Sequence, residues 1–325
     1  MVQSAEAKIA AEEMLIPSDT VGIELYIRNK RRADLTHFAA EKTLLFVAGS
    51  TYPASTSFDL ALGGMSWMDH LAARGYDTYL VDIRGYGHST RPPEMAAPAA
   101  DNEPIVRTPV AVRDITTAVA FIRSRKKLDR INLIGWSWGT TLMARYTADH
   151  NETVSKLVLL APQWVRETPS LADAGGVLGA YRVVERSAAK ARWLNGVPDG
   201  KKAELLPDTW FEAWADATFS SGQAGPGPAQ LVAPNGTVQD SREYWASGKP
   251  LYDPARITVP VLIVHADWDK DCPIEMSRAV FDRLTSAPYR RWVEIAEGTH
   301  SVFMEKNRWQ VFGAVDSFLG EQSPI

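Results

Sequence analysis

The amino-acid sequence predicts an α/β fold with a mostly parallel sheet and helices on both of its faces. Short apolar runs rich in β-branched residues alternate with longer stretches of helical spacing, a pattern typical of parallel βαβ units. The central runs are apolar on both faces, as strands covered by helices on each side must be. The chain has 325 residues, 45% of them hydrophobic and 23% charged, which is enough for one large domain with an insertion or for two domains.

Seven segments are predicted to form strands, and five segments between or after them are predicted to form helices. The strand segments are 21–29, 42–49, 76–83, 130–136, 155–162, 259–267 and 289–297. The helical segments are 58–74, 109–127, 139–149, 274–286 and 303–319. Gly75 directly follows one of the helical segments, as is common where a helix ends.

The alternation breaks once, between residues 163 and 253, where no buried strand is predicted. This stretch contains the turn-rich segment 220–230, which we interpret as a loop, and five tryptophans. We interpret 163–253 as a helical cap domain inserted after a strand, which leaves 1–162 and 254–325 as the core domain. Binding sites form at the carboxyl ends of parallel strands, where such an insertion would lie. A peripheral helical layer is the alternative that the pattern leaves open.

Composition and charge exclude several classes of function. The net charge is −4 and there is no basic stripe, so neither nucleic acid nor an anionic membrane surface is an expected partner. No apolar run reaches the roughly 18 residues that span a bilayer, and the first residues have no apolar core of signal-peptide length. Cys272 is the only cysteine and cannot form an internal disulfide, so we expect a cytoplasmic protein.

Residues 135–139, Gly-Trp-Ser-Trp-Gly, match the pattern G-x-S-x-G. The pattern is weak evidence by itself, but here it ends a predicted strand and opens a predicted helix, as a nucleophile elbow requires. The tight turn would hold the hydroxyl of Ser137 clear of the sheet, and the N–H groups at the helix start favour negative charge there. We therefore predict that Ser137 is a catalytic nucleophile.

A serine nucleophile needs a base within reach at the same edge of the sheet. His300 follows the last predicted strand and precedes the last predicted helix, so we predict that it is the base. His88 also follows a strand and is the second candidate. His265 lies within a strand and is expected to be packed in the core.

The base needs an acid that orients it, and the loop after segment 259–267 offers three carboxylates. Asp269 lies where this loop leaves the strand, so we predict that it is the acid. Asp267 still belongs to the strand end, and Asp271 is expected to cap the next helix. The spacing of the three also resembles the start of a calcium loop. A calcium loop needs glycine at its sixth position and glutamate at its twelfth, where this chain has Cys272 and Arg278. No metal site is therefore predicted.

The order Ser, Asp, His is the one that α/β-hydrolases use. From about residue 20 to its C-terminus the chain resembles members of that superfamily. Five segments carry the resemblance, in the family's order: LFVAGSTYPAS (45–55), VDIRGYGHST (81–90), GWSWG (135–139), ADWDKDCP (266–273) and GTHSVFMEK (298–306). The resemblance implies an eight-stranded sheet with the cap after its sixth strand. Two residues depart from the family pattern, Ala48 in place of a histidine and Thr140 in place of a glycine.

The resemblance implies a serine hydrolase of the esterase and lipase type that needs no metal or organic cofactor. Ser137 would attack an acyl carbon, His300 would transfer the proton, and Asp269 would hold the imidazole. The backbone N–H groups of Trp138 and Ser50 would form the oxyanion hole.

We expect a small-molecule acyl substrate, namely an ester, lactone or thioester with a small to medium apolar part. The candidate pocket residues are Thr51, Tyr52, Trp164, Trp210 and Trp214. A peptidase like the proline iminopeptidases, a carbon–carbon bond hydrolase and a ligand receptor without turnover are the alternatives left open. A homodimer is compatible with the sequence, which carries no signal for or against it.

Overall fold

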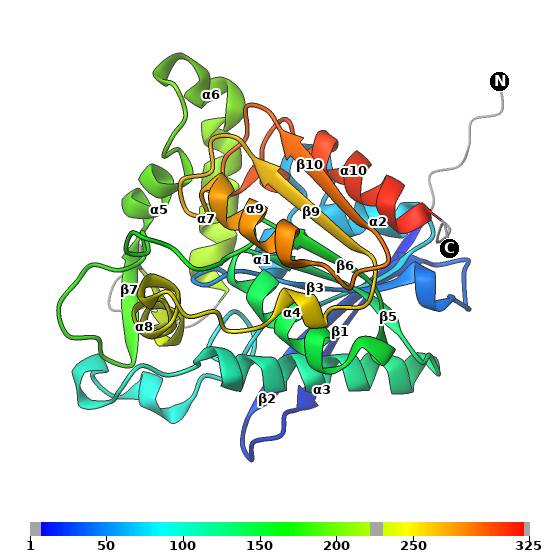
Figure 1. Ribbon diagram of the computed structural model, residues 1–325, viewed down its shortest axis with the longest axis horizontal. Helices are drawn as coiled ribbons and strands as arrows, with labels where there is room; N and C mark the ends of the chain where they lie inside the picture. The colour runs from blue at the N-terminus through cyan, green and yellow to red at the C-terminus, as the bar shows by residue number, and fades with distance from the viewer. Residues whose placement is uncertain (1–7, 222–229, 322–325) are drawn as a thin grey trace.

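The computed structural model describes residues 8–221 and 230–321, which form a central sheet with helices on both faces (Figure 1). The sheet has eight strands in the order β1-β2-β4-β3-β5-β6-β9-β10. Strand β2 is antiparallel to both of its neighbours, the edge strand β1 and β4, and all other neighbouring strands are parallel. The strands are β1 (Ile9–Pro17), β2 (Glu24–Arg32), β3 (Thr43–Val47), β4 (Asp77–Val81), β5 (Ile131–Trp136), β6 (Val154–Leu160), β9 (Val261–Ala266) and β10 (Arg290–Ile295). The predicted fold class is confirmed.

All seven predicted strands are present in this sheet, and β1 is the strand that the sequence analysis missed. Strand β1 is an edge strand, and most of its residues are partly or fully exposed. Its sequence, IAAEEMLIP, has few β-branched residues and no long apolar run, so its local signal is weak. Pairing along its whole length with β2 therefore decides its conformation.

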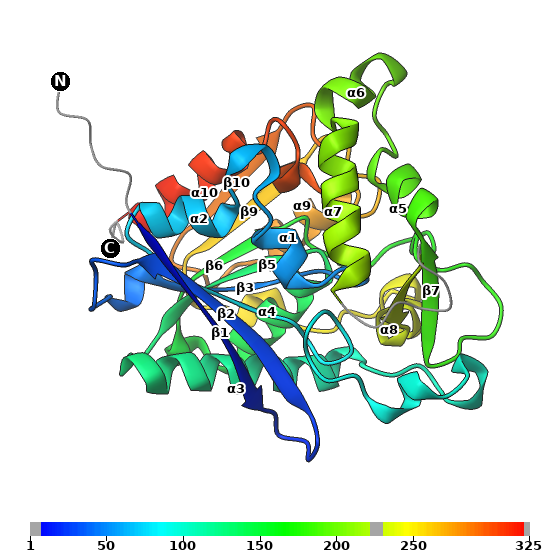
Figure 2. The same ribbon diagram turned by 180° about the vertical axis from the view of Figure 1, so that it is seen from behind.

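The central strands are covered on both faces. Helices α2 (Trp67–Ala73) and α10 (Trp309–Gly320) lie together on one face (Figure 2). Helices α3 (Thr108–Lys126) and α4 (Trp138–Asp149) pack against each other on the opposite face (Figure 1). Strands β3, β4, β5 and β9 are buried along their whole length, which is why their sequences lack polar alternation.

Two predicted helices begin later than expected. The segment 58–74 is broken because α1 (Ala54–Phe58) ends where the prediction begins, and Gly63 and Gly64 then take left-handed backbone angles. Helix α2 starts only after Ser66, whose hydroxyl accepts the backbone N–H of Asp69 in a capping box. Helix α10 starts at Trp309, because residues 302–304 form a short 3-10 turn. Helix α9 (Ile274–Arg283) begins where it was predicted.

In the residues that the structure describes, the segment between β6 and β9 contains four α-helices and a two-stranded antiparallel sheet. The helices are α5 (Arg186–Trp193), α6 (Lys202–Leu205), α7 (Asp208–Ser220) and α8 (Gly236–Glu243), and the strands are β7 (Tyr181–Glu185) and β8 (Gln230–Pro234). The expectation that this segment contains no strand was therefore wrong. Strand β7 is only partly buried, and so lacks the apolar run by which the core strands were found. Of the predicted loop 220–230, residues 222–229 lie outside the described part of the chain.

Candidate active site

Ser137 lies at the sharp turn between β5 and α4. Its backbone angles are φ 56° and ψ −122°, a left-handed conformation that residues with a side chain rarely adopt. The backbone N–H of Ser137 donates to the carbonyl oxygen of Leu160 at 2.9 Å, which ties the strained residue to the end of the neighbouring strand β6. The strand, the strained residue and the helix have the arrangement of a nucleophile elbow.

Three glycines allow the backbone to approach Ser137 closely. A Cβ atom on Gly135 would lie 2.4 Å from the carbonyl oxygen of Gly139, and one on Gly139 would lie 2.4 Å from that of Val47. A Cβ atom on Gly49 would lie 2.8 Å from the Cβ of Ser137. No side chain fits at these positions without moving backbone. The loop after β3 is therefore held directly against the serine side chain.

His300 and Asp269 form a hydrogen-bonded pair in the loops after β10 and β9. The distance between His300 Nδ1 and Asp269 Oδ2 is 2.8 Å, and the carboxylate is fully buried. The other oxygen, Oδ1, accepts the backbone N–H groups of Asp271 at 2.8 Å and Cys272 at 2.9 Å. A carboxylate held in this way fixes the imidazole with its proton on Nδ1 and leaves Nε2 as the basic nitrogen. Of the three candidate acids, the structure pairs Asp269 with the histidine.

The environment of His300 raises the pKa of its imidazole. Burial lowers this pKa, but the negative charges of Asp269 and Asp271 together raise it above its ordinary value. His265, by contrast, lies in β9 with Nδ1 3.1 Å from the hydroxyl of Ser277, and burial lowers its pKa. The expectation that His265 is a packed core residue is thus in agreement with its surroundings.

Asp271 does not cap the next helix, so that expectation was wrong. Helix α9 follows Pro273 and has no side-chain cap. The carboxylate of Asp271 instead accepts a hydrogen bond from Nε of Arg192 in α5, with a donor–acceptor distance of 2.9 Å. Burial raises the pKa of Asp271, but the charges of Arg192 and His300 lower it below its ordinary value. Asp271 thus binds an arginine that is far away in the sequence instead of the backbone of α9, and local spacing cannot predict such a partner.

The two tryptophans beside Ser137 have different structural roles. The indole N–H of Trp136 donates to the carbonyl oxygen of His300 at 2.8 Å, and the two rings lie 5.2 Å apart. The indole of Trp138 is fully buried and donates to the hydroxyl of Thr108 at the start of α3 at 3.0 Å. Trp136 therefore connects the elbow to the histidine loop, a link that the sequence analysis did not find.

Glu305 is a second residue that the sequence analysis missed. Its carboxylate accepts the backbone N–H of Thr299 at 3.1 Å, the hydroxyl of the same threonine, and the indole N–H of Trp193 in α5 at 2.9 Å. Burial raises the pKa of Glu305 to about 7. This carboxyl group joins the residue before His300 to the segment between β6 and β9. Glu305 ends the mostly apolar stretch SVFME (301–305), and this position could have indicated a buried acid. A buried acid needs hydrogen-bond donors around it.

The backbone N–H groups of Ser50 and Trp138 belong to the residues that follow Gly49 and Ser137, which pack against each other. Within the described ranges neither N–H donates a hydrogen bond. Trp138 is the first residue of α4, where an N–H group has no acceptor inside the helix. The two groups are therefore available to an oxyanion.

The predicted pocket residues do not line one common cavity. Tyr52 lines a cavity of about 760 Å³ between the loop after β3 and the β7–α5 region, whereas Trp164 lines a separate cavity of about 600 Å³. Trp214 is fully buried, and its ring centroid lies 4.8 Å from that of Tyr52. Trp210 lies beneath the guanidinium of Arg308 at 4.5 Å. Thr51 is buried, and its hydroxyl accepts a hydrogen bond from Nη2 of Arg182.

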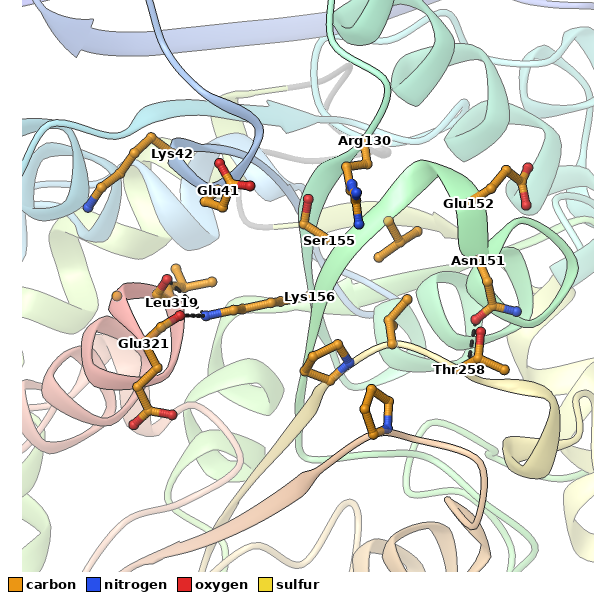
Figure 3. Close-up of a pocket in the computed structure, with 15 residues that line it drawn as sticks. Glu41, Lys42, Arg130, Asn151, Glu152, Ser155, Lys156, Thr258, Leu319 and Glu321 are labelled. Atoms are coloured by element: carbon orange, nitrogen blue, oxygen red, sulfur yellow. Dashed lines mark hydrogen bonds between the residues drawn. The ribbon is translucent and has the colours of Figure 1, made fainter. Parts of the chain in front are cut away.

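Another cavity, of about 1030 Å³, lies at the opposite edge of the sheet, and Figure 3 shows the side chains that line it. It is lined by residues that precede strands, among them Lys42 and Arg130, and by Lys156 near the start of β6. The Lys156 ammonium donates to the backbone oxygens of Phe318 and Glu321 at the end of α10, so it stabilises that helix end. Ligands of open parallel sheets bind at the carboxyl ends of the strands, which is the edge of Ser137.

The donor atoms of Asp269, Asp271 and His300 lie within 4.8 Å of one another, the only potential metal-ligand group in the part of the chain that the structure describes. These donors already have partners: Asp269 binds His300 and two backbone N–H groups, and Asp271 binds Arg192. The arrangement suits the transfer of a proton better than the binding of a cation. No helix within the described ranges is long and apolar enough to cross a membrane.

Comparisons with known proteins agree with the fold. A family model described as the alpha/beta hydrolase fold matches residues 53–307. Protein ABHD8 of Bos taurus is 25% identical over 293 residues, which are 86% of this chain and 59% of that protein. The chain thus spans less than two thirds of this relative's length. Two solved structures share the fold: an esterase from Exiguobacterium antarcticum (TM-score 0.62, 18% identity, 95% of this chain and 100% of that one) and a bromoperoxidase from Bacillus anthracis (TM-score 0.64, 16% identity, 95% and 100%).

Replacing Gly139 by alanine should destabilise the fold, because the new methyl group would lie 2.4 Å from a backbone oxygen of β3. We expect the free energy of unfolding in urea to fall by about 1–3 kcal/mol, as for other overpacked sites. Gly313→Ala is the matched control. Gly313 is exposed within α10 with no atom near its missing Cβ, and alanine there should stabilise by up to about 1 kcal/mol. Equal effects of the two changes would contradict the close-packed elbow.

Proposed function

The chain belongs to the α/β-hydrolase fold family, and on this premise we propose that it is a serine hydrolase that cleaves a carboxylic ester, lactone or thioester. One observation carries the proposal. The strained Ser137 follows β5, and the His300–Asp269 pair stands on the loops after β10 and β9 of the same parallel part of the sheet, so one elbow, one base and one acid occupy the same edge of the sheet. Two unbonded backbone N–H groups beside the serine complete the set.

The mechanism follows from the roles that these groups can take. Nε2 of His300 removes the proton of the Ser137 hydroxyl as its oxygen attacks the acyl carbon, and the protonated imidazole then donates that proton to the leaving group. Asp269 stabilises the imidazolium through Nδ1. The N–H groups of Ser50 and Trp138 bind the oxyanion, and loss of one such donor typically costs about 3 kcal/mol of transition-state stabilisation. Water, activated by the same histidine, then releases the acid from the serine.

We further propose that residues 163–253 act as a cap domain over this site, with 1–162 and 254–325 as the core domain. Three contacts support this assignment, and each joins the segment to a different loop of the core. Arg182 donates to Thr51 in the loop after β3, and Arg192 binds Asp271 in the loop after β9. The third contact is the bond from Trp193 to Glu305, after β10.

Turnover of 4-nitrophenyl esters from acetate to decanoate tests the proposed reaction. We expect the purified protein to release 4-nitrophenol from one or more members of the series, with the acyl-chain preference set by the cavity beside Tyr52. Ser137→Ala should abolish this turnover because it removes the attacking oxygen. Ser317→Ala, a change on the exposed face of α10, should leave it unchanged. If no ester is cleaved, or if Ser137→Ala retains the activity, the proposed reaction is wrong.

The two aspartates near His300 should give different pH profiles of kcat/KM. Activity rises with pH as His300 loses its proton, and the raised pKa places this rise above the ordinary histidine value of about 6.5. Asp271→Asn removes one of the charges that raise this pKa, so the midpoint should move to lower pH while most of the plateau rate remains. Asp269→Asn should lower the plateau itself by about 10⁴-fold, because it disturbs the imidazole tautomer. Equal losses of plateau rate in the two variants would argue against Asp269 as the acid.

A further inference from the structure

Two arginines face the cavity of about 760 Å³ that is also lined by Tyr52 of the loop after β3. Arg182 comes from β7 and Arg192 from α5, and both line this cavity together with the ring of Tyr52 (Figure 1 shows β7 and α5 at the same end of the molecule). The volume is within the range of small-molecule sites in proteins. A cavity of this size with two guanidinium groups in its wall is suited to an anionic ligand.

The two guanidinium groups differ in how their charge is compensated. Arg192 is paired with the carboxylate of Asp271. Arg182 donates to the carbonyl oxygen of Pro234 at 2.6 Å, to Asn235 Oδ1 at 3.4 Å and to the hydroxyl of Thr51, all of which are uncharged. Within residues 8–221 and 230–321, no carboxylate lies within ion-pair distance of Arg182. Burial lowers the pKa of its guanidinium, as expected for a cation with no charged partner.

Arg182 also keeps donors for a ligand. A guanidinium has five N–H groups in a planar fork, and the three bonds of Arg182 all start from Nη1 and Nη2. Its Nε–H has no acceptor in the described part of the chain. The other ionisable groups of the lining are Tyr52, Tyr181, Glu185 and Arg192. Tyr181 donates to the carbonyl oxygen of Ala97, and Glu185 is exposed and outside ion-pair distance of Arg182.

The position of Arg182 connects it to the reacting atoms. Its Nη2 donates to Thr51, the residue after Ser50, and Gly49 in the same loop packs on the side chain of Ser137. Thr51 is held at φ 98°, so the loop has a fixed shape between the arginine and the serine. An anion bound by Arg182 would therefore lie next to the loop that packs on the side chain of Ser137.

We propose that Arg182 binds a carboxylate of the substrate, so that this hydrolase acts on an ester, lactone or thioester whose acyl part carries a second, ionised carboxyl group. The proposal rests on the proposed function above. A single uncompensated positive charge matches a monoanionic carboxylate better than a phosphate dianion, and the fork geometry of arginine suits both carboxylate oxygens. Tyr52 supplies a further hydroxyl in the same wall. Substrate selection then depends on charge as well as on apolar size.

Matched esters test this specificity. The charged substrate is mono-4-nitrophenyl glutarate and the neutral one is 4-nitrophenyl pentanoate, which has the same acyl chain length and leaving group. We expect the wild-type protein to have the higher kcat/KM for the glutarate ester. Arg182→Gln should reduce that value by about 10- to 100-fold, the range for a hydrogen bond to a charged group, and change the pentanoate value by less than about threefold. Arg182→Lys should recover part of the glutarate rate, since it keeps the charge without the fork.

Arg186→Gln is the control for a general effect of removing a cation from this segment. Arg186 begins α5 but is paired with Glu212 and Asp216 and does not line the cavity, so both ester rates should stay unchanged. The proposal is overturned if Arg182→Gln lowers both ester rates equally, or if the wild-type protein prefers the neutral ester.

Calorimetric binding of monomethyl glutarate to the Ser137→Ala protein separates this proposal from the proposed reaction. Binding that is lost in Ser137→Ala/Arg182→Gln, and is absent for the neutral dimethyl glutarate, supports the carboxylate site even if no ester is turned over. Equal binding of the charged and neutral compounds, or no binding of either, contradicts the site. In that case hydrolysis of neutral esters by the wild-type protein would leave the proposed reaction standing.

Discussion

The strained backbone of Ser137 is the constraint on which the rest of the site depends. A residue with a side chain at φ 56° costs of order 1–3 kcal/mol, so the surrounding structure must hold it in place. The bond from its N–H to Leu160 and the contacts that only glycine permits at residues 135, 139 and 49 do so. The same contacts bring the loop after β3 to the serine and leave two N–H groups without acceptors. The strain and the proposed oxyanion site and nucleophile thus depend on the same set of packing contacts.

The segment between β6 and β9 is joined to the catalytic loops by polar contacts at buried or partly buried positions. Asp271 and Glu305 both bind residues of α5, and both stand within the loops that carry Asp269 and His300. Leaving such an acid without its partner would be costly, so movement of α5 away from the core is coupled to these loops. The proposed cap therefore contributes to the order of the acid and the base as well as to the wall of the cavity.

Much of the fold and the core of the site follow from local sequence signals. Apolar runs located seven of the eight strands, and G-x-S-x-G between a strand and a helix located Ser137. Asp269 and His300 were located by their place after strands, a rule that topology enforces. The missed features depend on their pairing partners or, for β7, on partial burial. Strand β1 is defined by β2, Asp271 by Arg192, and Glu305 by Trp193, and no local pattern records such pairings.

Covalent labelling of the 325-residue chain tests the central claim, that the elbow makes Ser137 a nucleophile. The protein is treated with an alkyl fluorophosphonate, and intact-mass and tryptic-peptide mass spectrometry then locate the adduct. We expect one adduct per chain, on the peptide 131–145, in which Ser137 is the only serine. His300→Ala should slow the labelling strongly because the serine then lacks its base. No adduct, or an adduct on a different peptide, would contradict the assignment.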